Sequence, residues 1–163
     1  MTLGQLLQAR GATVTVAESC TGGGIGAAIT AVPGSSQWFG TGFITYSDTA
    51  KQRWLQVDGA LLKHCGAVSG EVVEAMASGA LAQSGADYAV AVSGIAGPDG
   101  GSAEKPVGSV WLGWASRDGH CTSKLYIFKG DRDSVRQQAT AHALQGLLVM
   151  VQKELDQKVP DTV

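Results

Sequence analysis

Charged residues are scarce in this sequence. Only 16% of its 163 residues are charged, and the formal net charge of −2 leaves no excess of basic side chains. Proteins that bind nucleic acid usually have such an excess, because Lys and Arg neutralise the phosphates. A nucleic-acid partner would therefore need a local basic patch, which the sequence does not show. The composition favours a small-molecule ligand instead.

Features of secreted and membrane proteins are also missing. We expect no signal peptide, since none is apparent in the sequence, and there is no apolar run of the roughly 18 residues that a membrane span needs. Its three cysteines, Cys20, Cys65 and Cys121, leave one without a partner in any disulfide pairing. We therefore expect a cytoplasmic protein with no membrane partner.

Apolar residues and glycine are abundant. Hydrophobic residues make up 44% of the chain, and there are 23 glycines, a composition typical of globular α/β proteins. A chain of this length can remove roughly 70% of its unfolded surface from water. We expect a single domain over residues 1–163 with its core at about residues 10–155, and a frayed tail after Leu155.

The order of strand-like and helix-like segments predicts the architecture. Segments rich in β-branched and apolar residues predict strands at 12–19, 38–47 and 87–93, and a hairpin formed by 107–116 and 121–128. Apolar stripes and capping residues predict helices near the N-terminus before Gly11, at 21–30, from Ser47 or Asp48 to Leu55, at 69–85 and from Asp131 to about Leu155. This alternation predicts a three-layer α/β/α domain around a mixed sheet.

A serine occupies the junction between the first strand and the following helix. In "VAESCTGGGIGAAI" (16–29), Ser19 lies beside unpaired N–H groups at the start of the helix, where an anion would be stabilised. Gly22, Gly23 and Gly24 allow the backbone to approach a ligand closely, as in a phosphate cradle or an oxyanion hole. Alternatively, Ser19 or Thr21 is only the N-cap, and the glycines allow tight packing.

A nucleophilic serine needs a base, and a lysine is the strongest candidate. The three histidines have simpler structural places: His142 on the packed face of the last helix, His120 in the hairpin turn, and His64 in a segment without an acidic neighbour. Lys51 follows the second strand, whose end lies beside that of the first if the two strands are parallel. Burial would lower its pKa enough for it to accept a proton, although most lysines are simply solvated surface charges.

Nothing in the sequence indicates a metal site. The neighbouring pairs His64–Cys65 and His120–Cys121 do not have the spacing of zinc ligands, and the acidic residues are scattered rather than clustered. We therefore expect no metal and no redox cofactor.

Seven motifs, in the same order along the chain, resemble those of the CinA C-terminal domain family. The likeness covers about residues 10–150. The motifs are "AESCTGG" (17–23), "VPGSS" (32–36), "YSDTAK" (46–51), "GAVSGEVV" (66–73), "SGIAGPDGG" (93–101), "EKPVGSV" (104–110) and "GDRDSVR" (130–136).

The resemblance implies an enzyme that converts nicotinamide mononucleotide to nicotinic acid mononucleotide and ammonia, a step in pyridine nucleotide salvage. On matching positions it implies that Ser19 is the nucleophile, Lys51 the general base and Tyr46 a supporting group. It also implies a homodimer. Because no molybdopterin-binding-like domain precedes these motifs, we expect the stand-alone form of the family.

One position departs from the family pattern. Asp48 stands where the family usually has asparagine, in "YSN". An ionised carboxylate cannot donate a hydrogen bond to a substrate, and its negative charge would raise the pKa of a nearby Lys51. We expect this change to affect the rate more than the type of reaction.

Further residues are predicted to contact the substrate. Arg132 lies in the first turn of the last helix, where a cation is unfavourable unless an anion such as a phosphate binds to it, or unless it pairs with Asp131 or Asp133. The glycine-rich loop 94–106 follows a strand and offers free N–H groups, or is a rigid structural turn. The remaining predicted contacts are Thr21, Gly22, Gly23, Asp48, Ser93, Gly94 and Ala96.

Two other functions remain open from the residues. A non-catalytic module could use the same pocket to bind a nucleotide or a partner, although the presence of both Ser19 and Lys51 favours catalysis. A phosphatase could use the glycine loops, but it would lack the acidic cluster that holds catalytic metals.

Overall fold

The structure is a computed structural model that describes residues 1–157. Its strands are β1 (Val14–Glu18), β2 (Phe39–Ile44), β3 (Tyr88–Gly94), β4 (Ser109–Ser116) and β5 (Cys121–Ile127). Its helices are α1 (Leu3–Arg10), α2 (Gly24–Thr30), α3 (Asp48–Leu55), α4 (Gly59–Cys65), α5 (Gly70–Ser84) and α6 (Arg132–Gln157), and a 3-10 turn spans Ser35–Gln37. The frayed tail predicted after Leu155 falls mostly outside the described residues.

The five strands form one mixed sheet in the order β2-β1-β3-β4-β5. β1 pairs in parallel with β2 and β3, whereas β3–β4 and β4–β5 are antiparallel. The carboxyl ends of β1, β2 and β3 therefore meet at one edge of the sheet, which is where ligands bind in many α/β folds.

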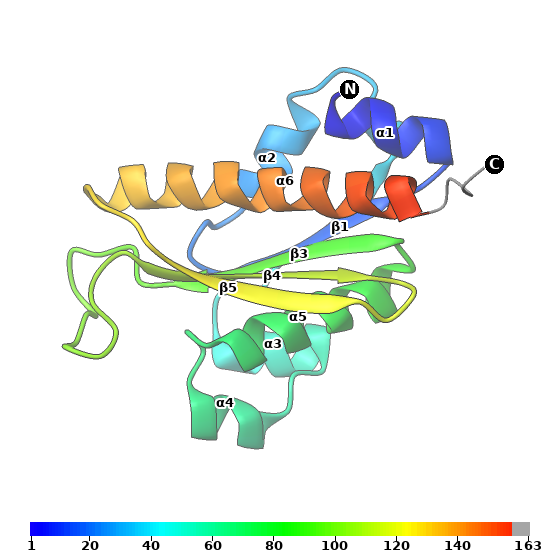
Figure 1. Ribbon diagram of the computed structural model, residues 1–163. Helices are drawn as coiled ribbons and strands as arrows, with labels where there is room; N and C mark the ends of the chain where they lie inside the picture. The colour runs from blue at the N-terminus through cyan, green and yellow to red at the C-terminus, as the bar shows by residue number, and fades with distance from the viewer. Residues whose placement is uncertain (158–163) are drawn as a thin grey trace.

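Helices cover both faces of the sheet (Figure 1). α1, α2 and α6 lie on one face, and α3, α4 and α5 lie on the other. Each interface has its own cluster of buried apolar side chains. These layers confirm the three-layer α/β/α prediction, which followed from strands alternating with helices. Within residues 1–157, no helix is both long and apolar enough to cross a membrane.

The long helix α6 packs on the sheet through a stripe of small residues. Gly146 allows the closest approach, because a Cβ added there would lie 2.2 Å from the Trp114 ring. The Trp114 ring N–H donates to the carbonyl of Ala143 at 3.0 Å. The prediction that His142 lies on the packed face needs correction, because its side chain is exposed and contacts the rings of Tyr126 and Phe128 at the open side of the helix.

Helix α4 was not predicted from the sequence. It has seven residues, too few for an apolar stripe to repeat, and of these only Leu62 is buried. The capping signals were nevertheless present. The Asp58 carboxylate accepts from the N–H of Ala60 at 2.9 Å, and Gly66 ends the helix.

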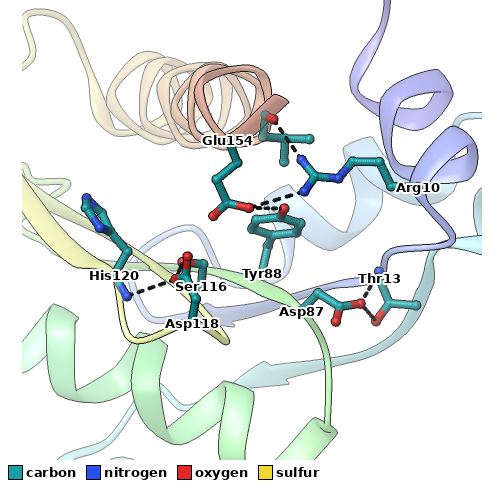
Figure 2. A network of polar contacts seen from close by, with 9 residues as sticks. Arg10, Thr13, Asp87, Tyr88, Ser116, Asp118, His120 and Glu154 are labelled. Atoms are coloured by element: carbon teal, nitrogen blue, oxygen red, sulfur yellow. Dashed lines mark hydrogen bonds and ion pairs between the residues drawn. The ribbon is translucent and has the colours of Figure 1, made fainter. Parts of the chain in front are cut away.

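At the amino end of β1 and β3, charged and polar side chains tie three elements together (Figure 2). Glu154 of α6 accepts a hydrogen bond of 2.5 Å from the Tyr88 hydroxyl and forms an ion pair of 3.4 Å with Arg10 of α1. Asp87 accepts from both the N–H and the hydroxyl of Thr13. This network fixes the carboxyl end of α6, whose other end lies at the opposite edge of the sheet.

Candidate active site at the carboxyl edge of the parallel strands

Ser19 directly follows β1, where the chain turns into α2. Its N–H donates to the carbonyl of Val92 at 3.0 Å, so the serine is still held by the sheet, and its carbonyl accepts from the N–H of Gly22 at 3.0 Å. Gly22 and Gly23 have φ angles of 58° and 105°, which residues with a Cβ rarely adopt. The glycines therefore serve the turn that positions Ser19.

The buried carboxylate of Glu18 caps the start of α2. It accepts hydrogen bonds from the N–H groups of Gly23, Ile25 and Gly26 at 2.8–3.1 Å and from the Thr21 hydroxyl at 2.5 Å. Neither Ser19 nor Thr21 is the N-cap, because Gly23 occupies that position. An internal carboxylate thus occupies the helix terminus, so the anion site predicted there is already filled by the protein itself.

Lys51 reaches Ser19 from α3. Ser47 caps this helix, which orients Lys51 inward, and the lysine side chain is only 1% exposed. Its Nζ lies 3.0 Å from Ser19 Oγ and donates to the carbonyls of Thr45 at 2.8 Å and Tyr46 at 3.1 Å.

The surroundings of Lys51 act on its pKa. Burial lowers the pKa of Lys51, and the nearby Asp48 carboxylate opposes this effect more weakly. Three oxygens lie within hydrogen-bond distance of its Nζ: Ser19 Oγ and the carbonyl oxygens of Thr45 and Tyr46. Ser19 Oγ in turn donates to the Tyr46 carbonyl at 3.5 Å.

A cavity of about 300 Å³ opens beside this pair. Segments that are distant in the sequence form its wall: the loops after β1 and β2, α3, the residues just before α5, the end of β3 with the loop that follows it, and the start of α6. Its lining residues are Ser19, Cys20, Tyr46, Lys51, Ala67, Val68, Ser93, Gly94, Ile95, Ala96, Gly97, Asp99, Gly100 and Arg132.

Arg132 lies at the mouth of the cavity, in the first turn of α6. Its guanidinium donates to the carbonyl of Gly97 at 2.8 Å and lies 3.5 Å from the Tyr46 hydroxyl. It pairs with neither Asp131 nor Asp133 within the described chain, since Asp133 instead lies 3.8 Å from Arg136. The charge of Arg132 therefore has no counterion among residues 1–157.

The structure brings together most of the residues predicted from sequence. Ser19, Lys51, Tyr46, Ser93, Gly94, Ala96 and Arg132 all line the cavity. The other four lie nearby but do not line it. Thr21 is turned toward Glu18, Gly22 and Gly23 form the turn, and Asp48 is exposed at the start of α3. The roles of all eleven remain predictions.

Some residues of this region were not singled out from the sequence. Arg136 donates to the carbonyls of Cys20 and Thr21, both at 3.1 Å, and so ties α6 to the turn that carries Ser19. Ala67 and Val68 form part of the cavity wall. Each lies in a motif quoted above, but only the tertiary fold shows what they contact.

Cys20 lines the cavity but is a poor nucleophile. Burial raises its pKa to about 11, so the thiol stays protonated near neutral pH. In residues 1–157, no three His, Cys, Asp or Glu side chains are grouped so that they could hold a metal ion.

Comparison with known proteins identifies the family. The family model described as the CinA C-terminal domain matches residues 1–151. This chain belongs to the CinA C-terminal domain family. It is 57% identical over 145 residues to the nicotinamide-nucleotide amidohydrolase PncC of Escherichia coli K12, covering 89% of this chain and 88% of that protein. It is 58% identical to the PncC of Pseudomonas putida, covering 90% and 91%.

Solved structures of the CinA superfamily have the same fold. A CinA superfamily protein from Klebsiella pneumoniae superposes with a TM-score of 0.89 at 40% identity, covering 93% of this chain and 94% of that one. A competence/damage inducible protein from Agrobacterium tumefaciens gives a TM-score of 0.85 at 41% identity, covering 90% and 94%.

Proposed function

We propose that the protein is a nicotinamide-nucleotide amidohydrolase, which converts nicotinamide mononucleotide and water to nicotinic acid mononucleotide and ammonia. The observation that carries this proposal is the 3.0 Å distance between Lys51 Nζ and Ser19 Oγ beside an open cavity. The identity of 57–58% to two PncC proteins supports the choice of substrate.

The reaction begins with proton transfer inside the Ser19–Lys51 pair. The lone pair of neutral Lys51 takes the hydroxyl proton as Ser19 Oγ attacks the carboxamide carbon. The carbonyls of Thr45 and Tyr46 support this role, because they hold the amine in place and stabilise the ammonium that forms.

Backbone donors next to Ser19 hold the negative charge that develops on the amide oxygen. The N–H groups of Gly22 and Gly23 already donate to Ser19 and Glu18. Those of Cys20 and Thr21 donate to no oxygen within residues 1–157 and are the better candidates. Protonated Lys51 then gives its proton to the departing amine, ammonia leaves, and water activated by Lys51 hydrolyses the acyl-serine.

Substrate binding uses both sides of the cavity. Arg132 binds the phosphate, because it is the cation at the cavity mouth and has no counterion in the described chain. The Tyr46 hydroxyl supports it from 3.5 Å. The nicotinamide end contacts Ser93, Gly94 and Ala96. The turn that positions Ser19 is formed by Thr21, Gly22 and Gly23. Asp48 acts indirectly, because its charge raises the pKa of Lys51.

The cellular role follows from the reaction. We place the enzyme in pyridine nucleotide salvage, as a single cytoplasmic domain that forms a homodimer and needs no metal, redox cofactor or nucleic acid. Three free cysteines support the reducing compartment. The exposed edge strand β2, with Ile44 61% exposed, supports a partner surface, and sedimentation would measure the oligomeric state.

The decisive experiment measures ammonia released from nicotinamide mononucleotide by the purified protein, with and without a chelator. We expect stoichiometric ammonia and nicotinic acid mononucleotide in both samples. Binding without ammonia would favour the non-catalytic module, and release of phosphate without ammonia would favour a phosphatase. Either outcome would overturn the proposal.

A further inference from the structure

We propose that Asp99 makes the enzyme selective for a positively charged pyridinium ring, and so for the oxidised nucleotide over its reduced form. This inference rests on the proposed function, because it concerns the same cavity. Asp99 belongs to the loop between β3 and β4, on the same wall as Ile95, Ala96 and Gly97.

The Asp99 carboxylate is free to meet a ligand. Of the described residues that line the cavity, Asp99 alone carries a carboxylate. The ion pairs within residues 1–157 join Arg10 to Glu154, Arg117 to Asp87 and Arg136 to Asp133, so none of them uses Asp99. Its charge is therefore not neutralised before substrate binds.

Packing on both sides of Asp99 holds the loop in place. A Cβ added at Gly97 would lie 2.5 Å from Val107 Cγ1, and one added at Gly101 would lie 2.7 Å from the backbone nitrogen of Val107. The guanidinium of Arg132 also donates to the carbonyl of Gly97 at 2.8 Å. The Asp99 carboxylate thus lies on a constrained turn, so little loop entropy is lost when a ligand binds to it.

The cavity offers one charged side chain of opposite sign to each charged group of the substrate. Nicotinamide mononucleotide carries a permanent positive charge on its ring and negative charge on its phosphate. Arg132 offers the cation and Asp99 the anion. Asp99 attracts the ring and Arg132 attracts the phosphate, so the two residues together favour the orientation in which the phosphate meets Arg132.

Reduction of the ring to the dihydro form removes its positive charge but keeps the carboxamide, ribose and phosphate. Among the charged contacts, only the attraction between the ring and Asp99 is then lost. Because Asp99 is exposed to solvent, we expect its effect to be about three- to fivefold, the upper part of the range for exposed ion pairs, and to decrease with added salt.

The test compares two probes on variants that cannot turn over. In a Ser19→Ala background, calorimetry would measure Kd for nicotinamide mononucleotide and for its reduced form, with and without Asp99→Asn. We expect Asp99→Asn to weaken binding of the oxidised nucleotide about three- to fivefold and to leave the reduced form unchanged or slightly tighter. Glu104→Gln is the matched control, because it removes a negative charge from the same loop outside the cavity lining.

The outcomes separate this inference from the proposed function. Equal changes for the two probes, no change for either, or the same selectivity loss in Glu104→Gln would each overturn the role of Asp99. Those results are compatible with full ammonia release by the wild-type enzyme. Absence of ammonia release would instead overturn the proposed function, whatever the binding data show.

Discussion

Charged side chains are paired at one end of the sheet and unpaired at the other. At the amino end of β1 and β3, Arg10, Glu154 and Tyr88 satisfy one another within a single network (Figure 2). At the carboxyl end, Lys51 is buried without a carboxylate in hydrogen-bond contact, and Arg132 has no counterion within residues 1–157. Pairing at the amino end stabilises the fold, whereas the unpaired end retains charge that a ligand can use.

The same helix connects these two ends. α6 begins with Arg132 at the cavity and reaches Glu154 in the network (Figure 1). Anchoring at the paired end limits movement at the other, where Arg136 holds the turn that carries Ser19. Substitutions at the two ends should therefore separate activity from stability.

The largest effect is expected from Ser19→Ala. Loss of the nucleophile should reduce kcat by about a thousandfold or more, while nucleotide binding is kept, because the other cavity contacts remain. Ammonia release and calorimetric Kd would measure the two quantities. Turnover near the wild-type rate would show that another group attacks the amide.

Arg132→Ala should come next. Loss of the charged contact with the phosphate should raise KM about ten- to hundredfold with a much smaller change in kcat. Steady-state kinetics would show the split. Arg117→Ala at the paired end is the matched control, and it should leave both constants unchanged because Arg117 pairs with Asp87 far from the cavity.

A pair of Tyr→Phe substitutions sharpens the comparison. Tyr88→Phe removes a buried hydrogen bond to Glu154 and should lower the free energy of unfolding by about 1 kcal/mol, or Tm by about 2–4 °C, without changing kcat/KM. Tyr46→Phe, whose side chain is 63% exposed, should lower kcat/KM and leave Tm unchanged. The reverse pattern in thermal melts and kinetics would contradict the division between the two ends.

The smallest effect is expected from Asp48→Asn. If Lys51 acts as the proposed base, only its neutral form supports the reaction, so kcat/KM should rise with pH through the pKa of Lys51 and then level off. The Asp48 carboxylate raises that pKa, and its removal should therefore move the acid limb of the profile to lower pH. A shift to higher pH, or an unchanged profile, would disagree with the assignment of Lys51 as the base.

Much of the fold could be predicted from local patterns. β-branched runs and apolar stripes identified the five strands and the longer helices, because the residues that are buried against a sheet are apolar and recur at regular spacing along the chain. α4 was missed because seven residues with one buried side chain leave no such record. His142 was placed wrongly because it lies at the edge of the packed face of α6, beside Tyr126 of the edge strand β5. Periodicity in the sequence does not show where the sheet beneath a helix ends.

Local patterns were enough to predict the layered architecture, the turn at Ser19 and the family, since these depend on residue types that are close together along the chain. The fold was needed to show that Lys51 is buried against Ser19 and that Asp99 and Arg132 share one cavity. Both pairs join segments about thirty residues apart along the chain, which no local pattern records. Parallel pairing of β1 with β2 and β3 brings those segments together, and burial then lowers the pKa of Lys51.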